Sequence, residues 1–113
     1  MVKVEAMVRP QKLDDIKTKL DEMGVTGVTI TEVRGAGRQH GVTQTYRGSQ
    51  YTINLLPKVK IEVVVTDDRA QAVAEAIMNV ARTGEIGDGK IFLIPILNAF
   101  RIRTGDEGET AIQ

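Results

Sequence analysis

The segment 83–90, Thr-Gly-Glu-Ile-Gly-Asp-Gly-Lys, contains residue types that could bind a phosphate group. Its glycines allow backbone N–H groups to approach an anion closely, and Lys90 adds a positive charge. Gly84, Gly89 and Lys90 fit the spacing G-x-x-x-x-G-K. However, Ile91 stands where a phosphate-binding loop needs Ser or Thr, and the segment leads from a helix into a strand. Two interpretations therefore stand: an anion site formed by backbone amides, or an ordinary helix-to-strand turn with a solvated lysine.

Arg101 and Arg103 are two residues apart in a predicted strand, so both side chains would project from one face about 6.6–6.8 Å apart. Two adjacent guanidinium groups repel each other unless an anion neutralises them, and phosphate fits their geometry. The alternative is that each pairs with Asp or Glu at a solvated sheet edge. Together with Gly87, Gly89 and Lys90, the two arginines favour a polyphosphate ligand.

Lys58 lies where a long segment, 37–55, rejoins the predicted sheet, and Gln39 lies near the other end of that segment. A small carboxylate bound to Lys58 could change the conformation of the segment. Simple solvent exposure of Lys58 is the alternative. His40 is the only histidine, and its surroundings are more typical of a solvated side chain than of a general base.

Composition excludes several classes of function. Lys+Arg and Asp+Glu number 15 each, and this zero net charge disfavours non-specific nucleic-acid binding. The absence of cysteine excludes disulfides, cysteine-based zinc sites and thiol nucleophiles. No Ser-His-Asp arrangement or transition-metal spacing is evident in the sequence. The chain begins with alternating apolar and charged residues and has no apolar run near 20 residues, so we expect no targeting peptide, no membrane insertion and a cytoplasmic location.

Hydrophobic periodicity predicts two strand–helix–strand units within 113 residues, a length that fits a single domain. The predicted elements are strand 2–8, helix 13–23, strand 25–34, strand 58–65, helix 67–81, strand 91–96 and a short strand 98–103. This order is that of an α+β, ferredoxin-like βαββαβ sandwich. The unbroken apolar run 91–96 predicts a strand buried on both faces, with self-association covering the face that the helices leave open.

The segment 37–55 is predicted as a long loop between the second and third strands. Compact domains rarely contain structureless loops longer than about 12–15 residues unless they are functional or disordered. This segment carries both tyrosines, Tyr46 and Tyr51, which favours contact with a partner or covalent modification over packing. Residues 105–113 are predicted to form a flexible C-terminal tail.

Three segments resemble the PII signal-transduction proteins, a family of nitrogen-regulatory trimers. They are Thr45-Tyr46-Arg47-Gly48-Ser49-Gln50-Tyr51, Leu56-Pro57-Lys58-Val59-Lys60-Ile61-Glu62, and 81–92 (Ala-Arg-Thr-Gly-Glu-Ile-Gly-Asp-Gly-Lys-Ile-Phe) followed by Arg101-Ile102-Arg103-Thr104-Gly105. The resemblance implies one PII-like domain and a homotrimer of ferredoxin-like subunits that binds ATP or ADP between neighbours. It also implies Mg²⁺, 2-oxoglutarate, and regulation of targets such as an ammonium channel, an arginine-pathway kinase or a nitrogen-metabolism enzyme or regulator.

The resemblance also assigns residues. Thr29, Gly35 and Val64 would surround the adenine, and the ribose and phosphates would contact Gly37, Arg38, Gly87, Asp88, Gly89, Lys90, Arg101 and Arg103. Gln39 would help to ligate Mg²⁺, which bridges ATP to 2-oxoglutarate, and Lys58 would pair with the 2-oxoglutarate carboxylate. Tyr51 and Ser49 match residues that relatives have modified. Two departures bear on these roles: Ala36 replaces a bulky residue near the nucleotide, and Gln50 replaces a glutamate before the tyrosine.

Two other functions compete with a metabolite-sensing regulator. A small ATP-hydrolysing or phosphotransfer enzyme would use the same phosphate-binding groups, but it needs a general base, and the chain offers only His40 or scattered carboxylates. A ferredoxin-like RNA-binding module would need aromatic residues on its sheet for base stacking, and the predicted strands carry few. We therefore expect a regulatory binding protein, neither an enzyme nor a nucleic-acid binder.

Overall fold

The computed structural model of the chain describes residues 1–36, 42–46, 49–53 and 55–113. Its main sheet has four antiparallel strands, in the spatial order β2 (Thr29–Gly35), β5 (Leu56–Val65), β1 (Val2–Val8) and β6 (Lys90–Pro95). The strand β1 therefore lies inside the sheet and pairs with both β5 and β6.

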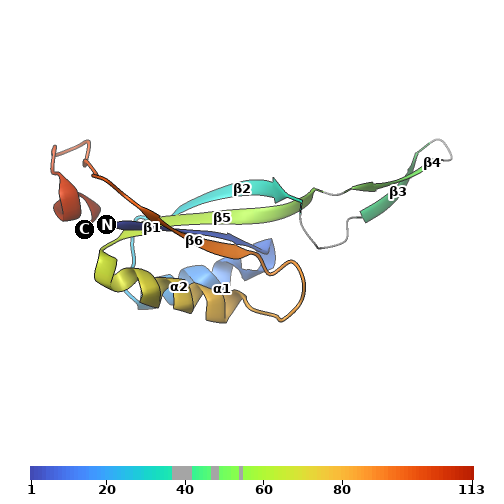
Figure 1. Cartoon of the computed structure of the whole chain (residues 1–113), viewed down its shortest axis with the longest axis horizontal. Helices are drawn as coiled ribbons and strands as arrows, with labels where there is room; N and C mark the ends of the chain where they lie inside the picture. Colours follow the sequence, from blue (N-terminus) through green and yellow to red (C-terminus); the bar gives the residue numbers. More distant parts are fainter. Residues whose placement is uncertain (37–41, 47–48, 54) are drawn as a thin grey trace.

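Two helices cover one face of this sheet (Figure 1). They are α1 (Leu13–Glu22), which follows the short 3₁₀ helix η1 (Pro10–Lys12), and α2 (Asp67–Ala81). Asp67 and Asp68 lie in the first turn of α2, where the helix dipole favours negative charge. The order of the main elements confirms the predicted α+β, ferredoxin-like βαββαβ fold.

The core follows from alternation along the strands. Because directly opposed residues of antiparallel strands project from the same face, Val4, Ala6 and Val8 of β1 share the helix-covered face with their β5 partners. These strand residues are nearly inaccessible to solvent. The helices close the core with side chains at helical spacing, among them Ile16, Leu20, Val73 and Ile77.

The opposite face of the sheet carries charged residues at its centre. Lys3 Nζ lies 2.9 Å from Glu62 Oε2, and Lys60 Nζ lies 3.7 Å from Glu62 Oε1 and 4.0 Å from Glu5 Oε1. Lys3, Glu5, Lys60 and Glu62 thus form a compensated group of four charges on neighbouring strands.

The segment predicted as a long loop contains a hairpin. Strands β3 (Val42–Tyr46) and β4 (Ser49–Ile53) pair antiparallel with each other and form a second, two-stranded sheet. The segment predicted as a long loop therefore contains regular hydrogen-bonded structure over these residues. The glycines of the segment indicated a loop, but valine, threonine, tyrosine and isoleucine are residues that favour strands.

Two strands differ from their predicted form. β2 begins at Thr29 rather than at residue 25, because Gly27 has a φ of +74°, which interrupts the extended conformation. β6 was predicted to be buried on both faces, but within one chain it is an edge strand, and Phe92 and Leu93 are almost half exposed. Apolar composition indicated burial, but a single chain supplies only β1 and part of α2 to cover this strand.

The predicted strand 98–103 is absent. The chain instead turns back on itself: Phe100 forms an isolated bridge with Glu107, and the Gly105 amide donates to the Arg101 carbonyl. Gly105, with a φ of +74°, permits this reversal. The last residues, which we expected to form a flexible tail, include the 3₁₀ helix η2 (Gly108–Ile112).

Among the helices of the described residues, none combines the length and the apolar character that crossing a membrane requires.

Replacing Ile77 by alanine is expected to lower the free energy of unfolding by about 2–5 kcal/mol, because this fully buried α2 side chain would leave a cavity. Met78→Ala, on the same helix but 41% exposed, is the matched control and should cost about 1 kcal/mol or less. Urea unfolding followed by circular dichroism measures both. Equal losses for the two variants would contradict the packing described here.

Candidate ligand site

A cleft of about 790 Å³ lies at the end of the sheet where the chain leaves β2 and enters β5. The turn between α2 and β6 forms its other wall. Residues from four separate parts of the chain line this cleft: Met7, Gly35, Ala36, Leu56, Lys58, Glu85, Ile86, Gly87, Asp88, Gly89, Lys90 and Phe92. Six residues that the sequence singled out are thus brought together here: Gly35, Lys58, Gly87, Asp88, Gly89 and Lys90.

Strand register places both lysines of the cleft on the open face of the sheet. Lys58 on β5 is opposite Val33 on β2, and Lys90 on β6 is opposite Met7 on β1. Met7 is in turn opposite Lys60 on β5. Since opposed residues of antiparallel strands share a face, Lys58 and Lys90 point to the side away from the helices.

The turn between α2 and β6 has three glycines in the left-handed region, with φ of +89° at Gly84, +103° at Gly87 and +100° at Gly89. Gly89 has a second constraint, because a β-carbon there would overlap the carbonyl oxygen of Met7 on β1. The glycine pattern that indicated an anion site therefore also serves the close packing of the turn against the sheet.

The Asp88 carboxylate closes this turn on itself. Asp88 Oδ2 accepts hydrogen bonds of 2.9 Å from the backbone amides of both Thr83 and Gly84, and Oδ1 accepts one from the Thr83 hydroxyl. The bonds from the Thr83 hydroxyl and amide, with those from Gly84 and Arg9, hold the pKa of the Asp88 carboxyl well below its ordinary value. The carboxylate of Asp88, a residue predicted to contact the nucleotide, is thus already hydrogen-bonded to other groups of the same chain.

Arg9 is a residue that the sequence did not single out. Its Nη2 donates to the Ile86 carbonyl at 2.9 Å, and its Nε donates to Asp88 Oδ1 at 3.3 Å. It directly follows β1 and precedes Pro10, and no local pattern marks it as more than a surface arginine. Only the packing of the turn against the end of β1 shows its role.

Lys58 Nζ donates to the carbonyl of Gly87 at 2.6 Å. Burial lowers the pKa of Lys58, and the nearby Arg9 guanidinium lowers it further, while Asp88 opposes the shift. Arg9 and the cleft residue Lys58 are thus two neighbouring cations that donate to backbone carbonyls of the turn.

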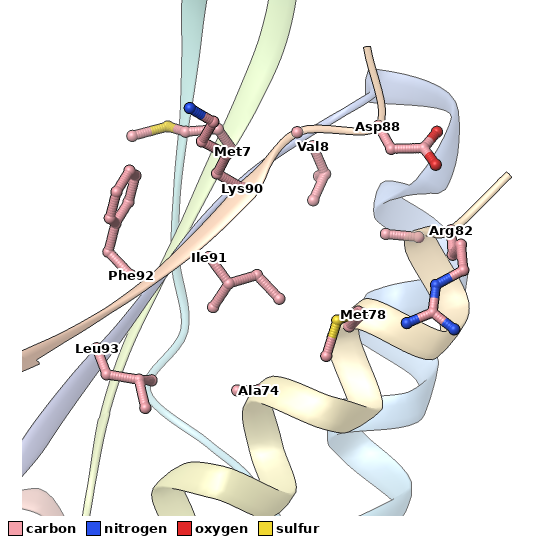
Figure 2. A pocket seen from close by; sticks show the side chains of 12 residues that line it. Met7, Val8, Ala74, Met78, Arg82, Asp88, Lys90, Ile91, Phe92 and Leu93 are labelled. Carbon is pink, nitrogen blue, oxygen red and sulfur yellow. The ribbon is translucent and has the colours of Figure 1, made fainter. Parts of the chain in front are cut away.

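A second cavity, of about 540 Å³, lies on the other side of β6. Figure 2 shows Ile91 of β6 facing the side of α2 where Met78 and Ala74 lie, with Met7, Lys90 and Phe92 on the opposite side of the strand. Apolar side chains therefore flank the open edge of β6 on both sides.

The remaining predicted ligands lie toward the other end of the sheet. Thr29 and Val64 are each six residues along their strands from Gly35 and Lys58, or roughly 20 Å at about 3.3 Å per residue. The segment that follows β6 runs away from the turn that precedes this strand (Figure 1), and Arg101 lies in it, six residues beyond the end of β6. Within one chain, the predicted meeting of both arginines with Gly87, Gly89 and Lys90 does not occur.

Arg101 is held by its own chain. Its guanidinium donates to Asp106 Oδ2 at 3.2 Å and to the carbonyls of Thr110 and Gln113 at 3.0 and 2.7 Å. This is the carboxylate pairing that stood as the alternative to an anion site. The predicted spacing of the two arginines on a strand was wrong, because residues 102–104 form a turn.

Several predicted residues lie outside the described part of the chain. Gly37, Arg38, Gln39 and His40 fall in an undescribed stretch, and only the backbone of Ser49 and Tyr51 is described, within β4. Among the described residues, no group of three or more histidine, aspartate or glutamate side chains is arranged to hold a metal ion.

A family model described as Nitrogen regulatory protein P-II matches residues 1–106. The chain belongs to this family. Proteins named Nitrogen regulatory protein P-II from Pasteurella multocida and Haemophilus influenzae are 54% and 55% identical to it over 112 residues, covering 99% of this chain and 100% of theirs. Nitrogen regulatory protein P-II 1 of Escherichia coli strain K12 is 51% identical over the same share of both chains.

The resemblance identified in the sequence is therefore confirmed. This P-II family member is a nitrogen-regulatory signal protein, a regulatory binding protein rather than an enzyme, and it acts on target proteins.

Replacing Gly89 by alanine in this P-II protein is expected to destabilise it strongly, since the new methyl group would overlap the Met7 carbonyl. Gly84→Ala is the matched control: it also has a positive φ, but open space surrounds it, so it should cost only about 1–2 kcal/mol of backbone strain. Urea unfolding compares the two. A Gly89→Ala variant no less stable than Gly84→Ala would contradict the packing of the turn on β1.

The Asp88 carboxylate gives a prediction for pH. The pKa of this carboxyl is lower in the folded than in the unfolded chain. Its contribution to the free energy of unfolding is therefore complete above its pKa in the unfolded chain, about 4, and is lost as pH falls toward its pKa in the folded chain. The difference in unfolding free energy between the native protein and Asp88→Asn should be constant from pH 7 to about pH 5 and should shrink below about pH 4. A difference that already declines between pH 7 and pH 5 would contradict the depressed pKa.

Proposed function

We propose that this P-II family member senses ATP or ADP together with 2-oxoglutarate and uses the segment 37–55 to control its targets. The observation that supports this proposal most directly is the cleft that joins Lys58, Lys90 and the turn 83–89 to the base of that segment. Gly35 and Leu56 are paired at the cleft, at the two points where the segment leaves and rejoins the sheet. A ligand bound here would favour some conformations of the segment over others through its differential affinity for them.

The nucleotide phosphates would bind Lys90 and the amides of Gly87, Asp88 and Gly89, with Arg38 and Gly37 contributing from the start of the segment. Arg101 and Arg103 follow the end of β6, and this end lies at the same end of the sheet as Thr29 and Val64. One copy of the chain would therefore supply the proposed ligands as two separate groups, and a neighbouring copy would unite them.

This division supports a homotrimer with a nucleotide site between neighbours. The segment after β6 leaves Leu97 and Ile102 fully exposed and Phe100 largely exposed, and β6 itself has an open, apolar edge. Two different surfaces of one chain that pair head to tail form a closed ring when the rotation closes. Phosphate binding would also draw Arg103, and Arg101 where it is released from Asp106, toward the ligand.

Lys58 would pair with a carboxylate of 2-oxoglutarate, and Gln39 would help to ligate a Mg²⁺ ion that bridges the oxo acid to ATP. Mg²⁺ keeps oxygen ligands from substrate phosphates and needs few from the protein, which fits a cleft whose described residues offer no acidic cluster. ADP lacks the γ-phosphate, so the bridged site would be incomplete with ADP. The protein would thereby report on energy and carbon supply together.

The hairpin of the segment 37–55 would be the part that meets target proteins, with Tyr51 and Ser49 as candidate modification sites on β4. Ammonium channels, an arginine-pathway kinase and nitrogen-metabolism enzymes or regulators are the proposed kinds of target. The proposed location is the cytoplasm, where these nucleotides and 2-oxoglutarate are available.

Calorimetric titration tests the nucleotide site. ATP should bind the native protein. Lys90→Ala or Arg103→Ala should lower the affinity for ATP by roughly tenfold to a hundredfold, the range for a lost charge-assisted hydrogen bond. Lys17→Ala, which removes an exposed charge of α1, is the control and should leave affinity unchanged. Failure of the native protein to bind ATP and ADP at millimolar concentration would overturn the proposal.

The same titrations test the oxo-acid site. 2-Oxoglutarate should bind only when ATP and Mg²⁺ are present, and Lys58→Met should abolish this binding while ATP still binds. A pull-down from native lysate with ATP plus 2-oxoglutarate against ADP would then identify the targets that switch. Binding of 2-oxoglutarate without ATP would contradict the bridged site.

A further inference from the structure

We propose that Arg9 is a positioning residue, which fixes the direction of the Gly87 and Asp88 amides so that they can donate to a phosphate. This inference rests on the proposed nucleotide binding and adds to it a residue that touches no ligand. It starts from two neighbouring carbonyls of the turn, those of Ile86 and Gly87, which accept hydrogen bonds from Arg9 and Lys58.

The two cations approach the turn from one side. Arg9 follows β1 and Lys58 lies on β5, which is paired with β1, and Arg9 is close enough to lower the pKa of Lys58. The Ile86 and Gly87 carbonyls therefore both point toward this pair of side chains, at 2.9 and 2.6 Å from their donors.

Peptide geometry converts this constraint on carbonyls into a constraint on amides. The chain has no cis peptide bond, and in a trans peptide the C=O and the following N–H point in opposite directions. The N–H groups of Gly87 and Asp88 thus point away from Arg9 and Lys58. The Gly87 N–H donates to no residue that the structure describes, whereas the Asp88 N–H closes the short turn at 86–87 without a hydrogen bond of good geometry, so a phosphate on this side could accept from both.

Arg9 also fixes the turn through Asp88. Its Nε donates to Asp88 Oδ1, and the same carboxylate binds the Thr83 and Gly84 amides, so one arginine joins both ends of the turn to the end of β1. The Arg9 side chain is only 19% exposed, which limits its alternative conformations. Without these bonds, the three glycines of positive φ would allow the peptide planes of the turn to rotate. Asp88 then meets a phosphate through its amide, while its carboxylate serves the turn.

The test compares Arg9→Gln, Arg9→Lys and a matched control, Lys17→Gln, on the full chain. Arg9→Gln should weaken ATP binding roughly tenfold, the worth of about one positioned hydrogen bond, and should weaken AMP binding less, because AMP has fewer phosphates to meet the amides. Arg9→Lys should recover part of the affinity, since its single ammonium can still reach one of the two acceptors. Lys17→Gln should bind as the native protein does. A general loss of structure would instead lower the fraction of competent protein equally for ATP and AMP.

A second readout needs no nucleotide. In ¹⁵N-labelled protein, the Gly87 and Asp88 amide resonances should shift, and their hydrogen exchange should change, in Arg9→Gln but not in Lys17→Gln. Asp88→Asn, which removes the carboxylate that Arg9 binds, serves where Arg9→Gln fails to melt cooperatively, and it should shift the Gly87 amide.

The outcomes separate the two proposals. Native protein that binds ATP, with unchanged ATP affinity and unchanged amide resonances in Arg9→Gln, would overturn the role of Arg9 and leave the proposed nucleotide site intact. Native protein that binds no nucleotide would overturn the proposed function. Independently of nucleotide binding, unchanged amide resonances in Arg9→Gln would show that Arg9 does not fix the direction of the turn amides.

Discussion

The inner position of β1 is the constraint on which the rest of the molecule depends. Its alternate residues, Val4, Ala6 and Val8, form the middle of the core, and its two edges bind β5 and β6. The same strand sets the candidate site: the Met7 carbonyl packs against Gly89, and Arg9, directly after the strand, binds the turn between α2 and β6. Core packing and cleft geometry thus share one element, and a shift of β1 would disturb both.

Much of the fold could be predicted because the signals are local. In β1 and β5 every second residue is apolar, and in α1 and α2 apolar residues recur at helical spacing, so burial and secondary structure agree. The errors arise where local pattern and tertiary context differ. The apolar run of β6 indicates burial, but one chain cannot cover it. The residues around Gly105 form a turn that apolar alternation alone does not reveal.

The residues of the candidate site also differ in whether a local sequence signal marks them. Lys58 and the residues from Gly87 to Lys90 could be predicted because a glycine-rich turn and a basic strand start carry chemistry in their own sequence. Arg9 could not, because its partners are 77 and 79 residues away and nothing near it in the chain differs from a surface arginine. The two arginines after β6 were chosen for a spacing that holds only in a strand. Within one chain they lie away from the cleft, and only the proposed assembly between copies would bring them to it.

Gly35 and Leu56 are the last paired residues of β2 and β5. This pair separates the sheet, which carries the core and the cleft, from the segment between the two strands. The excursion that begins after Gly35 returns to the adjacent strand, so it bridges no distance across the sheet, and the entropy of closing it grows only slowly with its length. Lengthening, shortening or exchanging this excursion should therefore change the free energy of folding little. A scaffold built in this way can acquire new recognition specificities by remodelling one insert, while the sheet and the cleft beside it stay unaltered.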